Sequence, residues 1–115
     1  MLVEFELNGQ KFSALNGGPQ FTFNEAISIV VPCADQAEVD YYWDRLSDDG
    51  QEIACGWLKD RYGLCWQIVP AVFFDMIADP DSARAARVTQ AMLGMIKFDV
   101  AALERAYAAA PLYAR

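Results

Sequence analysis

The order of patterns along the chain predicts a single α+β domain, read as hairpin, strand, helix, hairpin, helix, helix. Three observations predict it: short segments alternate apolar and polar residues, longer ones place apolar residues at helical spacing behind aspartates, and no segment of 20 to 50 residues repeats. The 115 residues, 55% of them hydrophobic, suffice for one core and not for two. We therefore expect one globular unit.

The first element is a hairpin of residues 2–7 and 10–15. They flank Asn8-Gly9, the dipeptide that most favours a type I′ turn because both positions tolerate a positive φ. In the first strand one face is apolar, formed by Val3, Phe5 and Leu7. Residues 16–19 (NGGP) then break the pairing.

The next two elements are a strand and a helix. A continuous apolar run at residues 27–31, closed by Pro32, predicts a central strand covered on both faces. Asp35 is expected to cap a helix of residues 36 to about 47, with Glu38 completing a capping box. Gly50 lies where a C-terminal glycine is expected. One stripe of this helix should pack on a sheet, and its residues are Val39, Tyr42, Trp43 and Leu46. We expect its two aromatic residues, Tyr42 and Trp43, to lie in the core.

The remaining elements are a second hairpin and two helices. Residues 52–59 and 64–69 form the hairpin around a polar loop at 60–63, and Pro70 ends it. Asp79-Pro80 predicts a helix start with proline in its first turn, and Asp99 predicts the cap of a last helix, to about residue 109. Residues 71–78 fit a strand, a loop or the start of a helix.

The composition limits the classes of binding partner and the cellular compartment that we expect for this protein. A net charge of −7, with nine Lys and Arg residues scattered along the chain, argues against a nucleic-acid partner. No run of about 18 apolar residues is present, and the acidic start differs from a signal peptide, so we expect no membrane partner. The three cysteines are odd in number, lack CxxC spacing and have apolar or β-branched neighbours, which indicates free structural thiols in a reducing cytoplasm.

Four motifs in a fixed order carry a resemblance to a known family: residues 12–19 (FSALNGGP), 38–43 (EVDYYW), 55–60 (CGWLKD) and 62–70 (YGLCWQIVP). They resemble the PhnB-like branch of the vicinal oxygen chelate (glyoxalase/bleomycin resistance) superfamily, whose members are often labelled 3-demethylubiquinone-9 3-methyltransferase. The resemblance implies two βαβββ modules around a shared cavity. Residues 25–72 would be a complete second module, 1–24 the end of a first one reduced to a hairpin, and 73–115 a C-terminal helical segment.

The start of the first module would lie upstream of Met1. A late start codon, a trimmed chain and a real variant each account for that, and the sequence does not decide among them.

The resemblance also implies where ligands would bind. In metal-using relatives the ligands come from the first and last strands of each module, which here correspond to Ser28, Gln67 and, at the end of the first hairpin, Asn16. All three are neutral oxygen donors, which bind divalent metals weakly. We expect neither a metal site nor a cofactor.

Several residues admit both a ligand-binding and a structural role. Gln67 could contact a ligand in the cavity or bond to neighbouring backbone. Trp57 could form an aromatic wall of the cavity, although core packing is the commoner role for a tryptophan in a strand. Lys59, Asp60 and Arg61 could orient an anion, although a charged hairpin tip is normally a solvated turn.

The leading hypothesis is a metal-independent protein that binds an unknown small molecule as a homodimer, or an enzyme of unknown reaction. One alternative is a metal-assisted isomerase or lyase, and another is a dimer without an active site. Homodimerisation is expected because the hairpin is marginal alone and leaves an apolar face and open edges. A methyltransferase is not supported, since Gly17-Gly18 is followed by proline and a strand rather than by the helix of a donor-binding turn.

Overall fold

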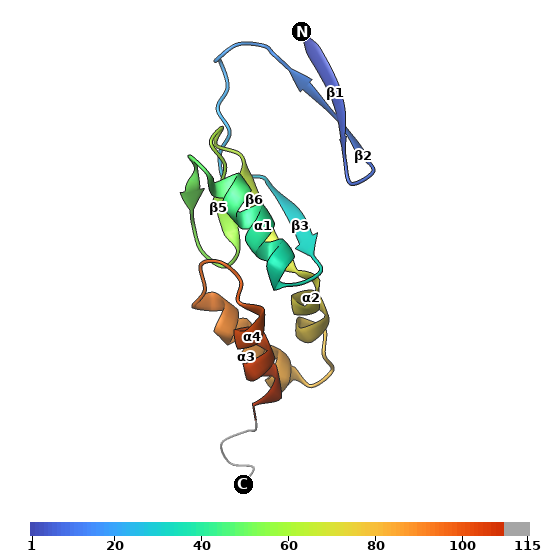
Figure 1. The fold of residues 1–115 in the computed structure, drawn as a ribbon, viewed down its shortest axis with the longest axis vertical. Helices are drawn as coiled ribbons and strands as arrows, with labels where there is room; N and C mark the ends of the chain where they lie inside the picture. Colours follow the sequence, from blue (N-terminus) through green and yellow to red (C-terminus); the bar gives the residue numbers. More distant parts are fainter. Residues whose placement is uncertain (110–115) are drawn as a thin grey trace.

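The computed structural model describes residues 1–109 and shows an α+β chain with two sheets and four helices in that range (Figure 1). The predicted class is confirmed. Residues 110–115 of the expected C-terminal segment lie outside the described residues. The elements are β1 (Leu2–Leu7), β2 (Gln10–Leu15), β3 (Ser28–Cys33), α1 (Gln36–Ser47), β4 (Gln51–Glu52), β5 (Trp57–Lys59), β6 (Cys65–Pro70), α2 (Ala71–Ile77), α3 (Ser82–Leu93) and α4 (Val100–Ala108).

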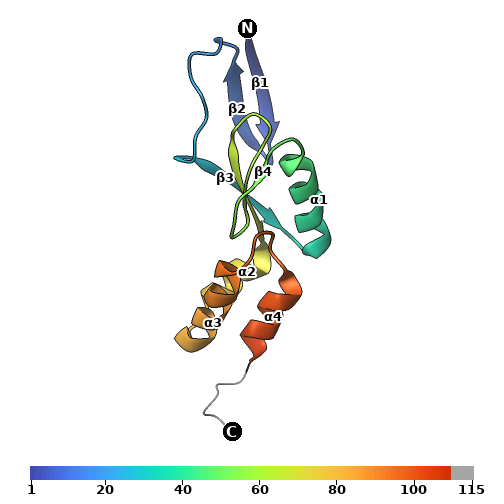
Figure 2. The ribbon, with the colours of Figure 1, turned by 90° about the vertical axis from the view of Figure 1, so that its left-hand side faces the viewer.

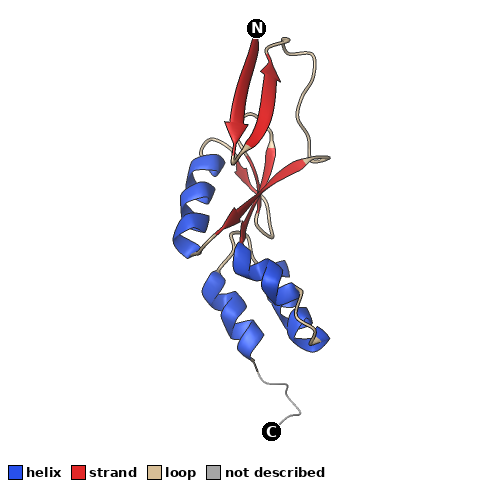
Figure 3. Ribbon diagram, turned by 90° about the vertical axis from the view of Figure 1, so that its right-hand side faces the viewer, coloured by secondary structure: helices blue, strands red, loops and turns tan. Residues whose placement is uncertain are grey.

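Strands β1 and β2 form the expected hairpin with the expected bounds. Asn8 and Gly9 have φ values of 49° and 82°, as the I′ turn requires. The hairpin is a sheet of its own and projects beyond the rest of the fold (Figures 1 and 3). Phe12 is half-buried, and the other strand residues of the pair are exposed.

The second sheet has the strand order β3-β6-β5-β4, with β3 parallel to β6 and the other pairs antiparallel. The expectation of a central strand at residues 27–31 is therefore wrong: β3 is an edge strand, and Val30 is 44% exposed. The strand also continues through Pro32, which an edge tolerates because one side of the strand has no partner for an N–H. An apolar run alone does not distinguish an edge from a centre.

Helix α1 begins as predicted. Asp35 Oδ1 accepts from the Glu38 N–H at 2.9 Å, and Glu38 Oε1 accepts from the Ala34 N–H at 3.2 Å, one residue before the position that a capping box would use. Trp43 is 3% exposed and lies in the core, whereas Tyr42 is 36% exposed. The expectation that both aromatic residues lie in the core is correct for Trp43 and wrong for Tyr42, which lies at the edge of the stripe.

Gly50 follows the helix for a different reason from the one expected. The residue with positive φ is Asp49, at 56°, whereas Gly50 lies against the neighbouring strand. A Cβ atom at Gly50 would come within 2.1 Å of the Lys59 carbonyl oxygen. Close approach of two backbone segments, rather than a left-handed turn, requires glycine here.

The predicted strand 52–59 is interrupted between β4 and β5. Cys55 and Gly56 have φ values of 56° and 84°, and their N–H groups donate to the carbonyls of Met95 and Ile96, at 2.8 Å each. The Gly56 carbonyl accepts from the Ile68 N–H at 2.8 Å. The break therefore ties the sheet to the segment between α3 and α4, a tertiary contact that local alternation does not reveal.

Between residue 71 and residue 109 the chain forms three helices. Residues 71–77, whose structure the sequence left open, form α2. Asp81, not Asp79, caps α3 by accepting from the N–H groups of Ala83 and Arg84, and Asp79 instead accepts from the Asp81 N–H in the preceding turn. Asp99 caps α4 as predicted, accepting from the Ala102 N–H at 3.1 Å. No helix within residues 1–109 has both the length and the apolar run needed to cross a bilayer.

The core lies between α1 and one face of the four-stranded sheet, and it continues under the C-terminal helices. Because side chains alternate along each strand, the register puts Ile29, Val31, Leu58, Trp66 and Ile68 on the side of α1. No helix of the described chain covers the middle of the opposite side (Figures 2 and 3). We call this uncovered surface the open face; its residues are Ser28, Val30, Trp57, Lys59 and Gln67.

Trp43→Ala tests the core. The side chain is almost completely buried, so its removal should lower the free energy of unfolding by about 3–5 kcal/mol, through lost burial and the remaining cavity. Tyr41→Ala, at a 49% exposed position of the same helix, is the control and should cost less than about 1 kcal/mol. Urea melts measure both, and equal costs would show that the packing face of α1 is wrong.

Candidate functional site

The open face brings two of the predicted site residues into contact. Gln67 on β6 donates from Nε2 to Ser28 Oγ on β3, at 2.8 Å. Both side chains are half-buried, and Val30 is the direct register partner of Gln67. Gln67 thus bonds to a hydroxyl rather than to backbone, and the bond uses only one of its N–H groups. The second amide N–H, the amide oxygen and the Ser28 hydroxyl proton are groups that a ligand could use.

Trp57 completes the same row of the sheet. It lies on β5 directly opposite Gln67, so the indole and the amide share one face. Trp57 is half-buried and lies outside the fully buried core. A flat aromatic surface beside an amide and a hydroxyl is a combination that can hold and orient a small planar molecule.

Lys59 also lies on the open face, in β5 rather than in the hairpin turn. Its register partner is Cys65, and its ammonium forms an ion pair with the carboxylate of Glu25, in the segment before β3. The hydrogen bond between the two raises the pKa of Lys59 and lowers the pKa of Glu25. Lys59 is 28% exposed and Glu25 61%, so the pair is accessible to solvent.

The other two charged residues of the predicted loop have structural and surface positions. Asp60 Oδ1 accepts from the N–H groups of Tyr62 and Leu64, and Asp60 Oδ2 accepts from Trp66 Nε1 at 2.9 Å. Arg61 pairs with Asp48 at 3.3 Å, with both side chains about half exposed or more. Asp60 therefore builds the turn, and Arg61 belongs to its solvated surface.

Asn16, the third residue suggested by the resemblance, is not near the other two. It follows β2 at the end of the hairpin farthest from the four-stranded sheet, and its N–H donates to the Met1 carbonyl at 2.9 Å. Figure 1 shows this end beside the N-terminus. Within the described chain, Asn16 shares no site with Ser28 and Gln67.

The donor atoms of the open face do not fit a divalent metal. Ser28 and Gln67 offer neutral oxygens, and Lys59, the charged residue that β3 to β6 place on this face, is a cation that would repel a metal ion. Over residues 1–109 no three His, Cys, Asp or Glu side chains cluster as metal ligands would. The chemistry available to these side chains is hydrogen bonding, apolar contact and ion pairing.

The three cysteines are free thiols. Cys33 is fully buried, and burial, with further contributions from Glu38 and Asp35, raises its pKa to about 11. Cys65 is also fully buried, and Cys55 is half-buried. The high pKa of Cys33 fits the structural role that the sequence predicts, because the thiolate is the reactive form.

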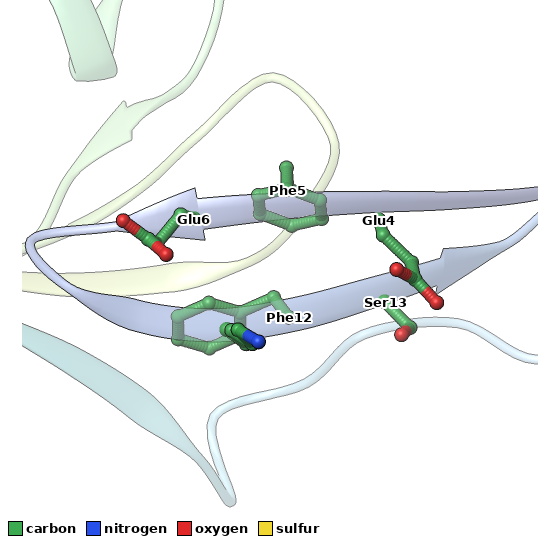
Figure 4. Close-up of a pocket in the computed structure, with 6 residues that line it drawn as sticks. Glu4, Phe5, Glu6, Phe12 and Ser13 are labelled. Carbon is green, nitrogen blue, oxygen red and sulfur yellow. The ribbon is translucent and has the colours of Figure 1, made fainter.

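Two hollows lie along the hairpin, and the second also reaches Val30 of the open face. A hollow of about 510 Å³ lies over the hairpin, where Phe5 and Phe12 stack with ring centroids 5.6 Å apart (Figure 4). Its walls come from two adjacent strands only, so it is the surface of a ribbon rather than an enclosed pocket. A groove of about 650 Å³ lies between the hairpin turn, the open edge of β3 and α1, with Phe12, Val30 and Tyr42 among its lining residues. Sequence reasoning missed this groove.

Residues 1–69 match the family model described as 3-demethylubiquinone-9 3-methyltransferase. The chain belongs to this family. A solved structure described as a 3-demethylubiquinone-9 3-methyltransferase-type PhnB protein, from Bacillus cereus, is 32% identical, with a TM-score of 0.58. The alignment covers 62% of this chain and 64% of that one. No curated protein matches.

The matched range places the open face within what the PhnB-like family shares. Strands β3 and β5, and β6 up to Val69, lie inside residues 1–69, and so do Ser28, Trp57 and Gln67. Helices α2, α3 and α4 follow the matched range. The mixed α+β fold is similar to that of the solved PhnB-like structure.

Proposed function

We propose that this PhnB-like protein binds a small molecule on the open face of its four-stranded sheet, without a resident metal, as a homodimer in the cytoplasm. We further propose that it belongs to the vicinal oxygen chelate superfamily. The element order β3, α1, β4, β5, β6 supports this assignment, since it is one strand, one helix and three strands. That order is the βαβββ pattern that the resemblance implies.

The observation that carries the binding proposal is the Gln67–Ser28 hydrogen bond beside Trp57. Binding sites for small molecules are mainly apolar, with a few polar groups that fix orientation. Here Trp57 and Val30 supply apolar surface, and the amide and hydroxyl supply directed hydrogen bonds. A planar molecule with one polar group fits this combination.

Benzamide, a neutral planar compound, is the probe that tests the site. In a titration followed by ¹H–¹⁵N spectra, we expect shifts of the Trp57 indole N–H and the Gln67 side-chain amide, since both face the bound ring. The Trp66 indole N–H is the internal control, because it lies on the α1 side and donates to Asp60. Shifts at Trp66 without shifts at Trp57, or none at millimolar benzamide, would contradict the proposed site.

Metal independence is tested by elemental analysis of protein purified without chelators. Because the open face offers neutral donors and a lysine, we expect less than one tenth of an equivalent of zinc, nickel, iron or manganese per chain. A stoichiometric metal that survives dialysis would show that ligands outside the described arrangement complete a site.

The shape of the chain supports a partner copy. Its radius of gyration is 17.2 Å, against about 13 Å for a compact domain of this length. Its accessible surface is 8024 Å², against about 6,300 Å² for a compact protein of this mass. The excess of about 1,700 Å² per chain is similar to what an obligate dimer buries per subunit. The exposed apolar face of the hairpin and the open edge of β3 account for the surfaces that need cover.

A second copy is the proposed cover, because a two-fold interface closes the same surfaces on both chains without growing into fibres. Sedimentation equilibrium should therefore find a dimer at micromolar concentration. Phe5→Asp puts a charge on the apolar face of the hairpin and should weaken the dimer by at least tenfold in dissociation constant. Ser13→Asp adds the same charge to the opposite face and should change little. A stable native monomer, or equal effects of both variants, would contradict the dimer.

A further inference from the structure

We propose that the open face selects a ring-bearing carboxylate, with Lys59 as its anchor, and that Glu25 occupies Lys59 until such a ligand displaces it. This inference rests on the proposed function and adds the chemical class of the ligand. It comes from the charge on the face, the spacing of its rows and the exposure of the Glu25–Lys59 pair.

Lys59 is the only charged side chain that strands β3 to β6 place on the open face. Strands β3 and β6 contain no charged residue, and β5 contains only Lys59. In β4, Glu52 is the register partner of Leu58 and so shares the α1 side. A ligand lying on Trp57 and Gln67 therefore meets a single cation and no strand carboxylate, which favours an anionic group at that end.

The rows of the sheet determine where the anionic group would lie. Lys59 is two residues beyond Trp57 on β5, a rise of about 7 Å. The register pairs Lys59 with Cys65 and Cys65 with Ser28, so these three residues form one row across the sheet. Cys65 is small and has no exposed surface, so the groups of this row that a ligand could reach are the ammonium of Lys59 and the hydroxyl of Ser28. Once Glu25 leaves, a carboxylate between these two groups would contact them while its ring contacts Trp57.

Glu25 shows that this position accepts a carboxylate. It reaches Lys59 from the segment between β2 and β3, so it is a carboxylate that the strands themselves do not supply. Exposed ion pairs are weak, and Glu25 regains full hydration when it leaves. A ligand carboxylate that gains ring contacts as well as the ion pair can therefore replace it. Glu25 would then act as a built-in competitor that rejects weakly bound anions.

The test compares benzoate with benzamide, which share a planar ring and differ in charge. Calorimetry on the native dimer should show about tenfold tighter binding of benzoate, because its bond to Lys59 is charge-assisted. Lys59→Met should abolish that preference and leave benzamide binding unchanged, whereas Lys59→Arg should retain most of it. Glu25→Gln should tighten benzoate binding severalfold by removing the competitor, with little effect on benzamide.

Lys97→Met is the matched control. Lys97 also pairs with a carboxylate, Asp40 at 2.8 Å, which raises its pKa, and its exposure of 37% is similar, but Asp40 lies on α1. This variant should bind both compounds as the native protein does. The ¹H–¹⁵N spectra of each variant check that the fold is intact, and Glu25→Gln and Lys59→Arg keep the test valid if Lys59→Met does not fold.

Two results separate the two proposals. Equal binding of benzoate and benzamide at Trp57 would overturn the role of Lys59 and leave the proposed binding function standing. Binding of neither compound would overturn both. A benzoate preference that survives in Lys59→Met, or that Lys97→Met removes equally, would also show that Lys59 is not the anchor.

Discussion

The pairing of β6 with β3 on one side and β5 on the other is the constraint on which the rest of the structure depends. Its alternation sends Trp66 and Ile68 into the core under α1, and Gln67 to the uncovered side. Since the period of a strand is two, a slip of one residue would exchange these faces, burying the amide and exposing the core. Core stability and the position of the candidate site thus come from one register.

The same sheet explains why we propose a partner copy. One face is closed by α1, but the hairpin contributes no strand to the sheet, and its own apolar face meets solvent. The groove beside β3 is the space left between these parts. A surface of this kind is uncommon on monomers of this size. The dimer and the ligand proposals therefore address the same physical problem, the uncovered side of a small sheet.

The family name refers to a methyl-transfer reaction, whereas the residues of the open face are of types that bind a small molecule. Ser28, Gln67 and Trp57 can bind and orient a molecule, and Lys59 can select its charge, but these side chains alone activate neither a methyl donor nor a nucleophile. Membership of the family rests on residues 1–69, and that range contains all four side chains. Function in a fold is carried by such sites rather than by the fold's name.

The sequence alone determined the α+β class, the β1–β2 hairpin with its Asn8-Gly9 turn, and helices α1 and α4 with their aspartate caps. It could do so because each of these features is specified by residues that lie close together in the sequence. The resemblance to a known family suggested Ser28 and Gln67 as site candidates, and the strand pattern suggested Trp57. Only the tertiary structure decided that Ser28 and Gln67 touch, that Asn16 lies apart, that β3 is an edge, and that residues 95 and 96 interrupt the strand before Trp57. Each of these features depends on contacts between segments that are far apart in the sequence. The ion pair between Glu25 and Lys59 depends on such a contact as well. Side-chain alternation within one segment carries no information about the partner strand.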